Sequence, residues 1–188
     1  MDASKARDHV EMIERIIAAS SQKLEAGGEF FLVWGLASGT FSVITQLIMD
    51  RRLPVAAFWL SGLLGLGAVV FSIVRGRYYR ASKDRVSLLQ REFLNVLYLA
   101  MGIAFIVNCI GYNIFSYWAS AAIWSAMAAI VLFYIGMHGN RRAQIGGIIV
   151  IVSIAAANFA SRDPGYLIAA GMYLGYAGFG LAELLARD

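Results

Sequence analysis

The sequence predicts an all-α, polytopic membrane protein, with six transmembrane helices paired as three hairpins after an N-terminal amphipathic helix. Three observations support this fold class. Hydrophobic residues make up 60% of the 188 residues and charged residues 15%, whereas soluble domains have about 45–50% apolar and about 25% charged residues. The apolar residues form six long runs, most of them able to cross a hydrocarbon core of about 30 Å. The charged residues lie between these runs.

Residues 3–25 are predicted to form an amphipathic helix, within a cytoplasmic segment at 1–28 that precedes the membrane domain at 29–188. Val10, Ile13 and Ile17 recur at helical spacing. The polar face mixes acidic with basic residues, whereas a helix that binds anionic lipid carries a basic polar face. Two interpretations remain open. The helix lies in the membrane plane under the bundle, or it docks a partner protein or a second copy of the chain.

The apolar runs give six predicted spans. In chain order they are 30–49, 55–74, 93–112, 118–137, 145–160 and 166–185. Pro54 and Pro164 stand at the start of the second and sixth spans, where the first helical turn tolerates proline. The fifth span is the shortest. Short connections join spans 1–2, 3–4 and 5–6 into hairpins.

The connector at 75–91 orients the chain. It contains six of the sixteen Lys and Arg residues, and loops this basic stay in the cytoplasm. With six spans, thirteen Lys and Arg residues fall on the side of the termini and three on the other side. The positive-inside rule therefore predicts that both termini are cytoplasmic. This distribution explains the net charge of +4 without a nucleic-acid partner.

Small residues recur at helical spacing within the spans. In lipid, where no hydrophobic force drives helices together, such residues let two helices approach closely. We therefore predict that they pack helices against one another. The set is Gly35, Gly39, Gly65, Gly171, Gly175 and Gly178.

Uncharged amides are the candidate site residues. Gln46, Asn108 and Asn158 are predicted in the outer half of three spans, with Asn113 just beyond. A lipid-facing amide costs free energy unless it is hydrogen-bonded, so these side chains are expected to point inward. They form interhelical hydrogen bonds, or they form the floor of an outward-facing pocket that admits a small-molecule ligand. The aromatic walls of that pocket would be Trp59, Trp124 and Tyr112.

The sequence contains no pattern for catalysis, metal binding or a cofactor. His9 and His138 are far apart, and the single cysteine, Cys109, has no second soft ligand near it. Glu29 and Glu183 fall at the cytoplasmic edge, where we expect them to pair with basic residues such as Arg75 or Arg142. No ionisable residue falls near the middle of a span, which disfavours a proton-coupled pump. We therefore expect a protein that is not an enzyme and that carries no metal or cofactor.

The last hairpin, IGGIIVIVSIAAANFASRDPGYLIAAGMYLGYAGFGLAELL, resembles those of the HdeD-type acid-resistance membrane proteins with short hairpin repeats. The segment KLEAGGEFFLVWGLASG also resembles small bacterial membrane proteins in which an amphipathic helix leads into a Trp-Gly motif, here Trp34-Gly35. The long N-terminal helix departs from the HdeD-type pattern. These resemblances imply a multi-pass protein of the bacterial inner membrane and a role in envelope stress.

Two function classes follow. The first is a non-enzymatic membrane protein that acts through association, as a homo-oligomer or with a partner bound at residues 3–25. The alternative is a small solute-binding or transport component that uses the outward-facing amide pocket.

Overall fold

The computed structural model describes residues 27–82, 88–111, 116–159 and 163–186, and within these ranges every regular element is helical. The amphipathic helix predicted at 3–25 lies outside the described residues. The elements are α2 (Gly28–Met49), η1 (Val55–Ala57), α3 (Phe58–Ser82), α4 (Leu88–Ile110), α5 (Tyr117–Met137), α6 (Arg141–Phe159), α7 (Pro164–Gly171), η2 (Met172–Ala177) and α8 (Gly178–Leu185). The α7, η2 and α8 segments form one continuous rod, of which η2 is a π-helical turn.

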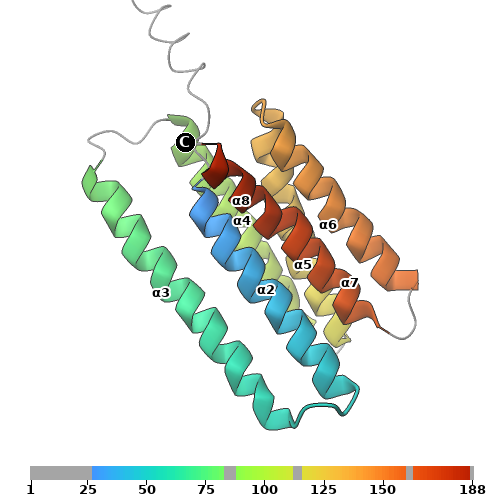
Figure 1. Cartoon of the computed structure of the whole chain (residues 1–188). Coiled ribbons are helices and arrows are strands. Elements are labelled where there is room, and N and C mark those ends of the chain that lie inside the picture. Colours follow the sequence, from blue (N-terminus) through green and yellow to red (C-terminus); the bar gives the residue numbers. More distant parts are fainter. Residues whose placement is uncertain (1–26, 83–87, 112–115, 160–162, 187–188) are drawn as a thin grey trace, which may run out of the picture.

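The helices run alternately up and down (Figure 1). The start of α2 and the end of α8 lie at one end of the bundle, here called the terminal end, and the end of α2 and the start of α3 lie at the other, the hairpin end. Among the described residues, five helical stretches are long and apolar enough to cross a membrane. They are 28–49, 55–78, 117–137, 141–159 and 164–185. A shorter apolar stretch, Asn95–Ile110, lies in α4. The structure thus supports an all-helical membrane protein.

Several helices extend beyond the predicted spans. The α3 helix continues to Ser82, eight residues into the predicted connector, because Arg and Tyr continue a helix readily once it leaves the hydrocarbon. The short fifth span becomes the 19-residue α6. Its extension depends on Asn140, whose side-chain oxygen accepts the backbone N–H groups of Arg142 and Ala143. This N-cap satisfies donors that would otherwise have no partner at the start of the helix.

The α7–η2–α8 rod lies between α2 and α6, and glycines set both contacts. A Cβ added at Gly28 would lie 2.7 Å from the carbonyl oxygen of Gly180, and one added at Gly180 would lie 2.5 Å from that of Gly28. On the other side, Gly146 and Gly175 approach each other with the same reciprocity. Backbone meets backbone at both contacts, which is the close approach that small residues permit in lipid.

Large apolar side chains fill the space around this rod. Phe31 of α2 is 4% exposed and its ring meets those of Phe93, Tyr176 and Phe179, at centroid distances of 5.0–6.4 Å. Phe31 therefore joins α2, α4, η2 and α8 at the terminal end. Leu132 of α5 is fully buried in the same cluster.

The α3 helix is peripheral and packs mainly against α2 (Figure 1). In its most apolar stretch 17% of the residues are buried, against 50% for residues 164–185. Polar and aromatic contacts join α3 to α2 toward the terminal end. Trp34 Nε1 donates a hydrogen bond to Ser72 Oγ at 2.9 Å, and the Phe30 and Phe71 rings meet edge to face. Toward the hairpin end, the buried hydroxyl of Ser61 has no hydrogen-bond partner within the described part of the chain.

Candidate functional site

Gln46 connects α2 to the start of α7 at the hairpin end. Its side chain is 2% exposed, its Oε1 accepts the backbone N–H of Gly165 at 3.0 Å, and its Nε2 donates to Asp50 Oδ1 at 2.9 Å. Pro164 occupies the first position of α7, so the Gly165 N–H is an early donor that α7 itself leaves without an acceptor. Gln46 thus acts as an interhelical cap, which agrees with the hydrogen-bonding interpretation.

A second link lies one residue away on α2. Tyr117 of α5 donates its hydroxyl to Thr45 Oγ1 at 2.9 Å, and Thr45 in turn donates to the Phe41 carbonyl. Thr45 is fully buried. This pair was not predicted, because Thr and Tyr in apolar helices give no distinctive sequence signal. Together, Thr45 and Gln46 hold the hairpin ends of α2, α5 and α7 in register.

The other predicted site residues do not gather around Gln46. Asn108 Nδ2 donates to the Ala104 carbonyl one turn back, and Asn108 Oδ1 accepts the Ser120 hydroxyl from α5. Asn158 is exposed on α6. The structure thus joins Gln46 and Asn108 to separate hydrogen-bond partners and leaves Asn158 exposed.

The two described residues of the predicted aromatic walls are both exposed. Trp59 is 80% exposed on α3, and Trp124 is 36% exposed on α5. Asn113 and Tyr112 lie outside the described residues.

Replacing Gln46 with leucine should destabilise the bundle. The change leaves the buried Gly165 N–H without its acceptor, at a cost of about 1–2 kcal/mol in the free energy of unfolding. Unfolding in mixed detergent micelles, followed by circular dichroism, measures the effect. Asn158→Leu is the matched control, because an exposed amide on a neighbouring helix is expected to change stability by less than about 0.5 kcal/mol. Equal stabilities for the two variants would contradict the capping role.

The acidic residues at the terminal end have polar partners. Arg75 donates from Nε and Nη2 to the two carboxylate oxygens of Glu29, at 2.5 and 2.7 Å. Glu183 instead accepts from Asn140 Nδ2 at 3.0 Å, while Arg142 donates to the Ala182 carbonyl. The prediction of an ion pair is confirmed for Glu29, and Glu183 has an amide partner in place of the guanidinium.

The Trp34-Gly35 motif has a structural explanation. Neighbouring residues on a helix point about 100° apart, so the two side-chain positions face different neighbours. Trp34 hydrogen-bonds to α3 through Ser72, whereas Gly35 lies against the backbone of Ala177. The motif therefore places α2 between its two neighbours.

The predicted packing glycines divide into two groups. Gly35 and Gly39 lie against Ala177 and Tyr173, and Gly171 and Gly175 lie against α6. A Cβ added at Gly65 would meet nothing within 4 Å, and one at Gly178 would meet a carbonyl of its own rod at an ordinary distance. Four of the six thus pack helices within one molecule.

The described part of the chain contains no cluster of side chains that could hold a metal ion. No three His, Cys, Asp or Glu side chains gather there. His138 contacts the carbonyl of Tyr134 through Nδ1, and Cys109 is an exposed free thiol on α4. What the described residues do offer is an apolar groove of about 640 Å³ between α2 and α3.

The chain matches no known protein-family model, no curated protein and no solved structure.

Proposed function

We propose that this chain is a non-enzymatic integral membrane protein that acts through association with a second copy of itself, with α3 as the contact helix. The observation that carries the proposal is the set of glycines on α3. An added Cβ at Gly62, Gly65, Gly67 or Gly76 would meet no atom within 4 Å.

Glycine inside a helix costs about 1 kcal/mol relative to alanine. Elsewhere in the bundle most glycines offset this cost by close contact with a neighbouring helix, as Gly28, Gly146 and Gly180 do. The α3 glycines have no such contact with the residues that the structure describes. A second helix approaching α3 would supply it, because small residues at a helix surface allow close packing in lipid.

The contact face follows from helical geometry. At 100° per residue, Gly62, Val69 and Gly76 recur every seven positions and share one side of α3. Val69 is 41% exposed there. Ser61 and Ala68, which are buried toward α2, lie about a quarter turn away. A twofold axis normal to the membrane would bring this side of α3 against the same side of a second copy.

We further propose the topology predicted from the charges: six crossings of the bacterial inner membrane, with the terminal end in the cytoplasm. The start of α2 and the end of α8 lie at the same end of the bundle, which is consistent with an even number of crossings. A role in envelope stress rests on the resemblance of the last hairpin to HdeD-type proteins. Residues 3–25 remain a second candidate contact, for a partner protein or for the other copy.

Cysteine cross-linking in native membranes tests the proposal. In a Cys109→Ser background, Gly62→Cys and Val69→Cys are expected to give disulfide-linked dimers with a membrane-permeable oxidant, because a disulfide needs Cα atoms within about 7 Å. Gly67→Cys, which lines the groove against α2, is the control on the same helix and is expected to remain monomeric. Absence of dimers at both 62 and 69 would refute association through α3.

Two further measurements separate the remaining possibilities. Native mass spectrometry of gently extracted protein should show a homo-oligomer, and a stoichiometric polar small molecule on a monomer would instead favour the solute-binding alternative. Removing residues 1–26 should leave the α3 cross-links unchanged. Loss of the dimer in that truncated protein would move the contact to the N-terminal segment.

A further inference from the structure

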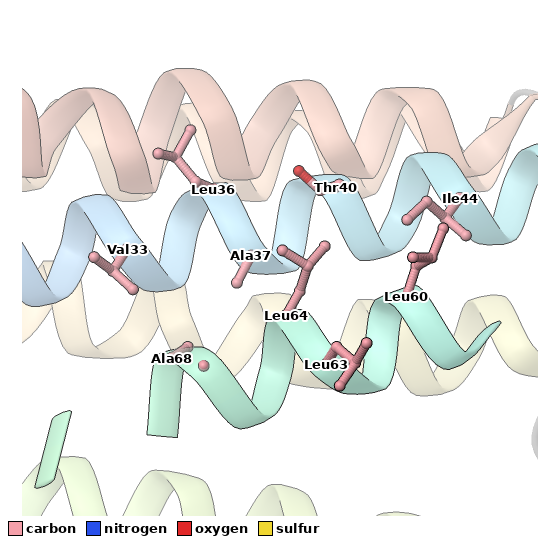
Figure 2. Close-up of a pocket in the computed structure, with 10 residues that line it drawn as sticks. Val33, Leu36, Ala37, Thr40, Ile44, Leu60, Leu63, Leu64 and Ala68 are labelled. Carbon is pink, nitrogen blue, oxygen red and sulfur yellow. The ribbon is translucent and has the colours of Figure 1, made fainter. Parts of the chain in front are cut away.

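The groove between α2 and α3 is a feature of the described surface that the proposed dimer leaves unused. Figure 2 shows Leu60 and Leu64 of α3 pointing toward α2 across it. Its volume is about 640 Å³, within the range of about 300–1,000 Å³ typical of ligand pockets. Ten residues line it: Val33, Leu36, Ala37, Thr40, Ile44, Leu60, Leu63, Leu64, Gly67 and Ala68.

The groove lies at membrane depth and runs along the helices. Its lining on α2 extends from Val33 to Ile44, about 17 Å along the axis. One leaflet of hydrocarbon is about 15 Å thick, so the groove has the length of a single lipid tail. Its limit toward the terminal end lies one turn from Glu29, whose ion pair with Arg75 belongs at the level of the headgroups.

The chemistry of the lining excludes a polar ligand. Nine of the ten residues are aliphatic or glycine, and the exception, Thr40, already hydrogen-bonds to Tyr173 at 2.8 Å. Ala37 and Ala68 contribute small side chains to the groove and Gly67 contributes none, while Leu36 and Leu63 are 48% and 64% exposed along it. Such an apolar groove suits a flexible hydrocarbon chain.

The terminal end of α3, beyond the groove, carries basic side chains. The Arg75 guanidinium is paired with the Glu29 carboxylate, and Arg77 follows two residues farther along the helix. Arg77 is exposed, and the Arg75 guanidinium lies 5.1 Å from the ring centre of the exposed Tyr78. Basic residues at this depth bind lipid phosphates.

We propose that the α2–α3 groove binds one acyl chain of a membrane phospholipid from the leaflet at the terminal end, with its phosphate beside Arg77. Polar contacts join α2 to α3 at the Glu29–Arg75 and Trp34–Ser72 pairs. The acyl chain fills the groove that lies beyond these contacts, toward the hairpin end. It occupies a different side of α3 from Gly62 and Val69, so this inference does not depend on the proposed dimer.

Photo-labelling in vesicles of phosphatidylcholine and phosphatidylglycerol tests the site. The probe is phosphatidylglycerol with a diazirine on one acyl chain, and peptide mass spectrometry locates the label. The wild-type protein is expected to take up label preferentially at 33–44 and 60–68. In Gly67→Phe this labelling should fall roughly threefold or more, because the new ring fills the groove. Gly62→Phe, an equally uncrowded glycine on the other side of α3, should keep it.

Other outcomes would overturn the proposal. One such outcome is a label that spreads evenly over the exposed residues of α3 and α4 and stays unchanged in Gly67→Phe. That result would mean that lipid contacts the groove no differently from the rest of the surface. Equal losses of label in Gly67→Phe and Gly62→Phe would have the same meaning. Disulfide-linked dimers from Gly67→Cys would show that a second copy covers the groove. If Gly67→Phe does not fold, Leu63→Trp at the groove rim replaces it and carries the same expectation.

Discussion

A Gly180→Leu variant is expected to lose most of its folded population in detergent. An added Cβ at Gly180 would lie 2.5 Å from the Gly28 carbonyl oxygen and 2.9 Å from the carbonyl carbon of Phe31, and both are backbone atoms that cannot rotate away. Relief therefore requires α8 to move off α2. Overpacking of this kind costs about 1–3 kcal/mol and more where backbone must shift, and the whole Leu side chain adds to the Cβ clash.

The measurement is the midpoint of unfolding in mixed detergent micelles, read by circular dichroism, together with the yield of monodisperse protein. Gly102→Leu on α4 is the matched control, since it makes the same change in an apolar helix where nothing lies within 4 Å of the added Cβ. It should be neutral or slightly stabilising, because leucine has the higher helix propensity. If the two variants unfold at the same midpoint, the close contact between α2 and α8 is not what holds the rod in place.

Phe31→Ala is the second substitution with a large expected effect. Phe31 is 4% exposed, and its ring joins three aromatic neighbours on three other elements. In lipid the transfer term is small, since the surroundings are as apolar as the core. The cavity and the lost ring contacts remain, and we expect a loss of about 3 kcal/mol in the free energy of unfolding, near the low end for Phe→Ala.

Phe105→Ala is the control for this change, because Phe105 is 62% exposed on α4 and leaves no internal cavity. Its unfolding midpoint should stay near that of the wild type. A Phe31→Ala protein as stable as Phe105→Ala would show that the bundle collapses around the vacated space, and that the aromatic cluster does not hold α2, α4 and the last rod together.

The functional proposals place different demands on α3. Association needs the side with Gly62 and Val69, whereas the lipid site needs the side with Gly67. Because both sides belong to one peripheral helix that packs mainly on α2, substitutions on one side are expected to leave the other intact. The cross-linking and photo-labelling experiments therefore report independently, and either proposal can fail alone.

The contacts at the terminal end of the bundle were easier to predict from the sequence than those at the hairpin end. Pairing of Glu29 with a basic residue was predictable, because an acid at the edge of a span needs a partner and the nearest basic run begins at Arg75. The role of Gln46 was predictable in kind, as an interhelical hydrogen bond. The identity of its donor, the backbone N–H of Gly165, was not predictable, since that contact joins residues 119 positions apart.

The sequence by itself determined the helical class and the approximate positions of the five stretches that are long and apolar enough to cross a membrane. These features depend on local composition and on the 3.6-residue helical period, both of which can be read from residues close together in the sequence. The tertiary structure alone decided which glycines pack within the molecule, where the amides find their partners, and that α3 lies at the periphery with a groove beside it. A side chain in lipid has no water to avoid, so hydropathy cannot distinguish a helix face that meets another helix from one that meets lipid. That distinction arises from the backbone contacts of particular pairs, such as Gly28 with Gly180.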